Sequence, residues 1–364
     1  MQAILAALLF VCLTVTGAVG ANRSFGDSLT AGVNATPASN GWAPLVWAQL
    51  GLPYTNYGVN NTMVADMATT VYPINIADGD ISTVMIGGND ERILQNDPVK
   101  REFFKLGLKD QIAWLALINK KKGTTAALTG SWSPTVAYGI GMVSGTPGST
   151  AIFENVSGTV IFVSMAYQNV NGTYDILIDG VKVGSGSTYA AGITTPGGKS
   201  YGPMLYQFPV AAGLHTVQIA VTSGPYVYVE WVAGNDQPAL PPVYVLNIIR
   251  ASNYTFGGSD AIVDDYNANA VAPAVAELAA AGLNVKLINA HDALNSTTDM
   301  GPDYHPNNSG YAKIAAVAYA AMSGPPPLYS FEPVQVYHRL TSGVPDGTLW
   351  IDDGEQRKQL ATVP

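Results

Sequence analysis

The chain has 364 residues, of which 12% are charged and 48% hydrophobic, and its net charge is −9. This length accommodates two domains or one domain with a large insertion, and the composition predicts a packed core rather than a disordered chain. The acidic balance argues against nucleic acid as a partner, because phosphate binding requires basic patches. The single cysteine, Cys12, excludes an intrachain disulfide, and the four histidines lack the spacing of a metal site, so we expect no metal.

The N-terminal residues 1–20 are predicted to be a secretory signal. Residues 2–20 are apolar and end in small residues, which favours cleavage near Gly20 or Ala21 and an extracellular protein. The alternative is that part of this stretch forms the first strand of a sheet. No other stretch is long and apolar enough to span a membrane, so we expect no span in the mature chain.

Helices and strands alternate in the first third of the chain. Residues 42–50 carry apolar side chains on one face and predict an amphipathic helix, 81–86 predict a short buried strand, and 99–120 predict a longer helix. The lysines at 120–122 are interpreted as the end of that helix, where positive charge interacts favourably with the helix dipole, rather than as a binding patch.

The pattern changes at about Gly123. Residues 124–237 have almost no helical periodicity, and Asn171-Gly172 and Asp179-Gly180 are typical hairpin turns between short alternating runs. The runs that predict strands are 159–164, 173–178, 215–221 and 226–232. We therefore expect an all-β sandwich inserted into the chain.

The alternation of strands and helices then resumes. The expected elements are a strand at 243–249, a helix at 264–281 closed by Gly282, a strand at 285–289 and a helix at 309–322. The sequence thus predicts an α/β domain made of residues 21–123 and 238–325, interrupted by the insert. Residues 326–364 are too few to fold alone, so we expect them to pack on the body or to form an assembly segment that joins copies of the chain.

Four short motifs contain the groups that acyl transfer requires. In order along the chain they supply a serine, a backbone N–H, an amide and a histidine, which together make a nucleophile, an oxyanion hole and a base. The motifs are Gly26-Asp27-Ser28-Leu29, Asn56-Tyr57-Gly58, Gly87-Gly88-Asn89-Asp90 and Asp303-Tyr304-His305-Pro306-Asn307.

The motifs lie where strands are expected to end. Ser28 is placed at a turn from strand to helix and Asn89 directly follows a buried strand, so both belong at the carboxyl edge of a parallel sheet, where ligands bind in such folds. His305 precedes Pro306, which favours an extended backbone, and a base on that loop can reach the same edge. Taken singly, each residue has an ordinary alternative: a helix cap for Ser28, turn residues for Gly58 and Asn89, and a solvent-exposed His305.

On these residues the chain resembles the GDSL/SGNH hydrolase family of serine esterases and lipases, over its two α/β segments. The resemblance implies a three-layer α/β/α, flavodoxin-like core with a parallel sheet. It also implies that Ser28 is the nucleophile and His305 the general base. The N–H groups of Ser28 and Gly58 and the side chain of Asn89 would then form the oxyanion hole.

The acid of the triad departs from the family pattern, which usually places an aspartate three residues before the histidine. That position is Pro302 in this chain. Asp303 lies two residues before His305, and alternate residues of an extended loop point to the same side, so we favour Asp303 over Asp299 or a backbone carbonyl. Asp27 is interpreted as a structural hydrogen-bonding group.

The insert resembles the jelly-roll, carbohydrate-binding-type modules that often accompany this family. Aromatic side chains of the insert are candidates for stacking on sugars, and the alternative is that they are core residues or cross-strand pairs. These aromatic residues are Trp132, Tyr138, Tyr167, Tyr189, Tyr201, Tyr206 and Trp231. Residues 347–360 resemble repeats in phage tail proteins, which implies a virion-associated, trimeric enzyme as an alternative to a secreted one.

Together these features predict a serine esterase without a cofactor, and removal of O-acetyl groups from a polysaccharide is the favoured activity. The first alternative is a lipase or general short-chain esterase in which the insert serves as a lid. The second is a glycan-binding adhesin or phage tail protein whose hydrolase core is inert.

Overall fold

The computed structural model describes residues 20–135, 138–190, 192–254 and 257–324, together with the strands 347–352 and 357–363. The chain forms two compact units, residues 1–322 and residues 323–364. The predicted signal segment lies outside the described residues, apart from Gly20. In the described part of the chain, no helix is long and apolar enough to cross a membrane.

A five-stranded parallel sheet forms one half of the first unit. Its strand order is β14-β13-β3-β1-β2, and all neighbouring strands are parallel. The strands are β1 (Asn22–Gly26), β2 (Thr55–Gly58), β3 (Ile81–Met85), β13 (Val243–Leu246) and β14 (Val285–Ile288). The chain builds β2 on one side of β1 and β3 on the other, so the carboxyl ends of β1 and β3 flank a crevice. The predicted α/β arrangement with a parallel sheet is confirmed.

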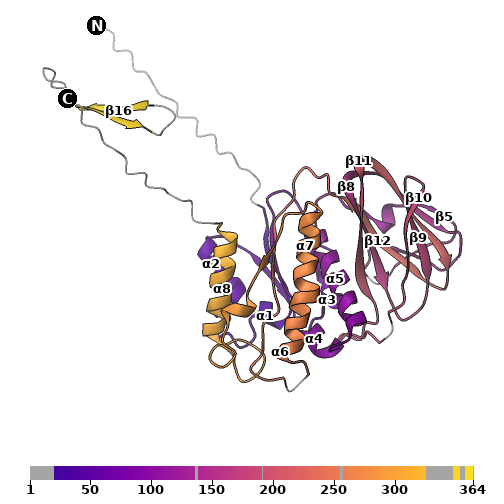
Figure 1. Ribbon diagram of the computed structural model, residues 1–364, viewed down its shortest axis with the longest axis horizontal. Coiled ribbons are helices and arrows are strands. Elements are labelled where there is room, and N and C mark those ends of the chain that lie inside the picture. Colours follow the sequence, from indigo (N-terminus) through magenta and orange to yellow (C-terminus); the bar gives the residue numbers. More distant parts are fainter. Residues whose placement is uncertain are drawn as a thin grey trace, which may run out of the picture. The chain divides into compact units, whose positions relative to one another are not determined.

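Helices cover both faces of this sheet, as its strands require. On β13, Val243 and Val245 face one hydrophobic cluster, and Tyr244 and Leu246 face the other. α2 (Trp42–Leu50) and α8 (Asn308–Met322) pack on one face; α3 (Val64–Val71), α5 (Pro98–Ala116) and α7 (Ala272–Ala280) pack on the other (Figure 1). Shorter elements are α1 (Ser28–Ala31), α4 (Gly88–Leu94), α6 (Asp260–Tyr266) and the one-turn segments Ala38–Asn40, Gly123–Thr125, Asn267–Val271 and His291–Ala293.

The insert is built from one antiparallel sheet of nine strands. Its main path is β10-β9-β11-β8-β12-β7-β6, while β4 pairs with β12 and β5 pairs with β8. The strands are β4 (Lys121–Lys122), β5 (Ala127–Thr129), β6 (Ser133–Pro134), β7 (Met142–Ser144), β8 (Thr150–Tyr167), β9 (Thr173–Ile178), β10 (Val181–Ser187), β11 (Gly202–Ser223) and β12 (Val227–Gly234). A large antiparallel sheet is therefore present, but the predicted jelly-roll of two sheets is not confirmed.

The two long strands of this sheet explain its continuity. β8 has 18 residues; its first half pairs with β5 and its second half with β12, while β11, with 22 residues, pairs along most of β8. The first half of β8 alternates between buried and exposed residues, whereas residues 161–167 are all buried. The second half is therefore covered on both faces.

Helix α5 lies between the two sheets. Its residues 107–116 are all buried, so it is covered on every side, and one hydrophobic cluster contains residues of both sheets. The rings of Trp114 in α5 and Trp231 in β12 pack edge to face, with centroids 5.8 Å apart. The rings of Phe103 in α5 and Tyr167 in β8 have centroids 4.7 Å apart. The antiparallel sheet is thus joined to the α/β part through a shared core.

Two predicted helices differ from the observed ones. α5 ends at Ala116 rather than at 120, because Lys121 and Lys122 pair with β12 as strand β4. Lys120 still interacts with the end of α5, since its Nζ donates to the carbonyl of Trp114 at 2.9 Å. Burial lowers the pKa of its amine to about 7. The predicted helix at 264–281 begins earlier, at Asp260, and passes through a π-helical turn before Pro273, which has no N–H to donate.

The second unit contains a pair of antiparallel strands. β15 (Gly347–Asp352) pairs with β16 (Arg357–Val363), with a register shift between Leu349 and Trp350. Both strands belong to the segment 326–364, whose role in assembly remains a prediction.

Candidate active site

Ser28 occupies the turn between β1 and α1. Gly26 has a φ of +155°, and a Cβ there would lie 2.0 Å from the carbonyl oxygen of Met85, so this position requires glycine. Asp27 caps α1 by accepting the Leu29 N–H at 2.9 Å, as the sequence predicted for a structural aspartate. Ser28 is the first residue of α1, so its own N–H belongs to the unpaired N-terminal turn of that helix.

The structure brings His305 onto Ser28. The His305 Nε2 lies 2.8 Å from the Ser28 Oγ, although 277 positions separate the two residues along the chain. The two side chains are 6% and 8% exposed, respectively, which leaves the contact shielded but reachable. The loop before α8 is held in this position by a hydrogen bond of 2.7 Å from the Gly301 N–H to the His305 carbonyl.

Asp303 is the acid in contact with the imidazole. Its Oδ2 lies 3.1 Å from the His305 Nδ1, while its Oδ1 accepts the His305 backbone N–H at 2.9 Å and the Asn34 Nδ2 at 2.8 Å. Burial alone would raise the pKa of Asp303, but these hydrogen bonds outweigh it and hold the pKa below its usual range. The carboxylate is therefore kept charged beside the ring.

Asp299 has different partners. Its Oδ2 accepts the Asn295 N–H and the Lys313 Nζ, each at 2.7 Å, and its Oδ1 lies 3.3 Å from the Ser309 Oγ. These contacts hold the pKa of Asp299 below its usual range, although burial opposes the shift. Asp299 ties its loop to α8, so of the two candidate acids the geometry favours Asp303.

Ser252 and Asn253, which follow β13 along the chain, support the loop that carries Asp303. The Ser252 Oγ lies 2.9 Å from the carbonyl oxygen of Gly301 and 2.7 Å from that of Asp303, so its one hydrogen is shared between them. The Asn253 Nδ2 donates to the Pro302 carbonyl at 2.6 Å. Sequence reasoning missed both residues; their only signal was a position just past a strand at the same edge of the sheet.

Asn89 is the second residue of helix α4, just past the carboxyl end of β3, and is 2% exposed. Its Nδ2 donates to the Thr62 carbonyl at 2.9 Å, and its Oδ1 accepts a hydrogen bond from Arg92. An amide nitrogen carries two hydrogens, so one remains for a ligand. Asn89 and Ser28 line the same pocket, and the part of Asn89 in the oxyanion hole stays a prediction.

Gly58 is less directly placed for the oxyanion hole. Its N–H donates to the Asn56 Oδ1 at 2.8 Å, and that bond would have to yield before Gly58 could bind an oxyanion. Glycine is also required here for packing, because a Cβ at this position would lie 2.3 Å from the backbone nitrogen of Ala31 in α1. Its part in the oxyanion hole stays a prediction.

The pocket at Ser28 is small, with a cavity volume of about 20 Å³, and it opens to solvent. Two carboxyls line it with raised pKa values: burial raises the pKa of Asp27 to about 7 and that of Glu91 to about 8. The lining residues are Asp27, Ser28, Leu29, Gly88, Asn89, Glu91, Arg92, Ile249, Ala251 and Tyr304. Within the described residues, no group of three His, Cys, Asp or Glu side chains is arranged to hold a metal ion.

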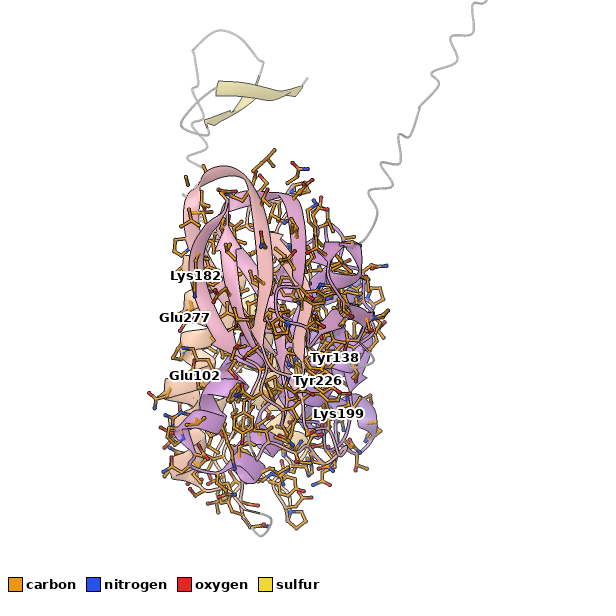
Figure 2. The ribbon with its side chains drawn as sticks, turned by 90° about the vertical axis from the view of Figure 1, so that its right-hand side faces the viewer. Glu102, Tyr138, Lys182, Lys199, Tyr226 and Glu277 are labelled. Carbon is orange, nitrogen blue, oxygen red and sulfur yellow. The ribbon has the colours of Figure 1, made fainter. Side chains whose placement is uncertain are left out.

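Three of the seven aromatic residues proposed for sugar stacking are buried and not available for it. Trp231, Tyr167 and Tyr138 are 0%, 2% and 9% exposed. The hydroxyl of Tyr138, a residue labelled in Figure 2, donates to the Ala65 carbonyl at 3.3 Å. These three are core residues at the junction with the α/β part, which corrects the stacking interpretation for them. Tyr189 is 50% exposed and remains a candidate.

No family model matches the chain, and no curated protein sequence matches it. Among solved structures it is similar to a member of the lipolytic protein G-D-S-L family from Veillonella parvula DSM 2008, with a TM-score of 0.39, 15% identity, and coverage of 82% of this chain and 94% of that one. It is also similar to a two-domain esterase active on acetylated mannans (TM-score 0.32, 9% identity, coverage 59% and 90%). Carbohydrate-binding module CBM36 in complex with calcium and xylotriose gives a TM-score of 0.26 at 19% identity, with coverage of 32% and 98%. With TM-scores of 0.39 or lower, these likenesses assign no activity, so function is inferred from the site.

Proposed function

We propose that this protein is a serine esterase. The observation that carries the proposal is the hydrogen-bonded series Asp303–His305–Ser28, with distances of 3.1 Å and 2.8 Å. This order of acid, base and hydroxyl activates a serine for acyl transfer.

The proposed reaction has two steps. The Ser28 Oγ attacks the ester carbonyl and passes its proton to the His305 Nε2, while Asp303 stabilises the imidazolium. The Ser28 N–H and the Asn89 Nδ2 are the proposed oxyanion donors, together with the Gly58 N–H once its bond to Asn56 yields. His305 then returns the proton to the leaving alcohol, and an activated water releases the acid from Ser28 by the same route.

We propose acetyl groups on a polysaccharide as the substrate. The pocket beside Ser28 is partly apolar, with Leu29, Ile249 and Ala251 in its lining, which suits a short acyl chain. The low charge and the large antiparallel insert support a glycan rather than a lipid substrate. A secreted, glycan-degrading enzyme, with copies joined through the C-terminal strands, is the corresponding proposal for location and assembly.

Acetate release tests this function. Wild type should release acetate from acetylated xylan and from an aryl acetate, and Ser28→Ala should abolish both. Preference for long acyl chains would favour the lipase alternative. Retention on glycan without any turnover by wild type would favour the adhesin alternative and would contradict the proposed esterase.

A further inference from the structure

Arg92 joins two parts of the candidate site. It lies on α4, three residues after Asn89, and is partly buried in the lining of the Ser28 pocket. Its Nε donates to the Gly88 carbonyl at 2.8 Å, and its Nη2 donates to the Asn89 Oδ1. Its guanidinium also lies over the ring of Tyr304, 3.8 Å from the centroid.

These contacts determine which way the Asn89 amide faces. A guanidinium has only donors, so the atom of Asn89 that meets Arg92 must be the oxygen. The Thr62 carbonyl has only acceptors, so the atom that meets it must be the nitrogen, at 2.9 Å. Arg92 and Thr62 together leave the second Nδ2 hydrogen as the group available to an oxyanion.

The contact with Tyr304 reaches the other side of the site. The Tyr304 ring packs against the His305 ring with centroids 4.7 Å apart. Cation–π contacts of this kind favour a fixed ring position. One arginine therefore supports both the oxyanion residue and the neighbour of the base.

We propose that Arg92 is a positioning residue for the esterase, which orients the Asn89 amide towards the oxyanion and braces Tyr304 against His305. The proposal rests on the esterase function proposed above. Because an oriented donor acts on the transition state more than on the bound ester, loss of Arg92 should lower kcat and leave KM for a small ester nearly unchanged.

The test is a double-mutant cycle on an aryl acetate, with Arg92→Met, Asn89→Ala and the double variant. Asn89→Ala should lower kcat by about 10²–10³-fold, as removal of one oxyanion donor does. Arg92→Met should lower kcat by about 10-fold or more in wild type, and by a smaller factor in the Asn89→Ala background, where only the contact with Tyr304 is left to lose. Arg101→Met is the matched control, because Arg101 pairs with Asp265 away from the pocket, and it should keep wild-type kcat.

A second substitution guards against misfolding. Arg92→Lys keeps the charge but loses the planar fork that serves Gly88 and Asn89 at once, so it should recover kcat only in part, with an unfolding midpoint like that of wild type. Full activity of Arg92→Met, or single effects that multiply in the double variant, would overturn the role assigned to Arg92 while the esterase stands. Wild type that neither releases acetate nor is labelled at Ser28 by a fluorophosphonate would overturn the esterase and this inference together.

Discussion

Carboxyl groups have opposite surroundings at the parallel-sheet edge and at the junction between α5 and the antiparallel sheet. At the edge, Asp303 accepts hydrogen bonds from His305 and Asn34, and its pKa is lowered. At the junction, Asp110 of α5 and Glu230 of β12 are buried without a basic partner. Burial raises the pKa of Asp110 to about 7 and that of Glu230 to about 8.

The groups differ in exposure and in donors: the Asp303 side chain is 38% exposed, whereas Asp110 and Glu230 are fully buried. Tyr72 and Trp231 donate to the Asp110 Oδ1, but among the described residues nothing lies within hydrogen-bond distance and geometry of the Asp110 Oδ2 or of either Glu230 oxygen. Deep burial raises the pKa of the junction carboxyls, whereas partial exposure and hydrogen-bond donors keep Asp303 charged. The Asp303 carboxyl is thus held charged, whereas the two junction carboxyls are held protonated.

The largest expected effect is at the charged group. Asp303→Asn should lower kcat by about 10²–10⁴-fold, because an amide cannot stabilise the imidazolium in the same way. Asp299→Asn is the control: it should cost stability through Lys313 and Asn295 but keep most of kcat. Steady-state rates on an aryl acetate and thermal unfolding of both variants make the comparison, and an inactive Asp299→Asn beside an active Asp303→Asn would reverse the assignment.

A smaller effect is expected at the junction, in the pH dependence of stability. A carboxyl whose pKa is raised on folding contributes stability that is fully present below its unfolded pKa, about 4, and is lost as pH rises through the folded value. For Glu230 the loss should thus run from about pH 4 through about pH 8. The Glu230→Gln variant cannot ionise at this position. Its free energy of unfolding minus that of wild type should therefore be about 1–3 kcal/mol larger at pH 9 than at pH 4.

Urea unfolding at pH 4, 7 and 9 measures this difference. An equal pH slope for wild type and Glu230→Gln would show that Glu230 is not held protonated in the folded protein.

The smallest effect concerns a second aspartate–histidine pair, on the antiparallel sheet. The His215 Nδ1 lies 2.7 Å from the Asp179 Oδ2, and its Nε2 lies 2.8 Å from the carbonyl oxygen of Ala211. In the candidate site, by contrast, the His305 Nε2 contacts the hydroxyl of Ser28. A ring that donates from both nitrogens is protonated, and the hydrogen bond to Asp179 raises the pKa of His215.

The resulting stability should be present below the unfolded pKa of histidine, about 6.5, and lost as pH rises through the folded pKa. Because the Asp179 side chain is 52% exposed, we expect Asp179→Asn to cost only about 0.5 kcal/mol at pH 5.5 and almost nothing at pH 9. Chemical unfolding at the two pH values tests this, and a constant cost would mean that charge is not the reason.

The sequence predicted the centre of the site better than its supports. Ser28, Asn89 and His305 each follow or precede a regular element, so the α/β pattern was sufficient to bring them to one edge. Asn34, Ser252 and Arg92 are single polar residues without a local pattern, and only the folded chain shows what they contact.

The same distinction holds for the fold. The strands of the insert were predicted from alternation, but alternation does not specify partners, and the two halves of β8 pair with different strands. The end of α5 was misplaced for a related reason: Lys121 and Lys122 are compatible with a helix end, and their pairing with β12 is a tertiary contact.

The most direct test of the account is reaction with diisopropyl fluorophosphate followed by peptide mass spectrometry. An activated serine should form one adduct, on Ser28, and formation should be much slower in Asp303→Asn. An adduct on another residue, or none under conditions in which the protein is folded, would contradict the claim that Asp303 and His305 activate Ser28.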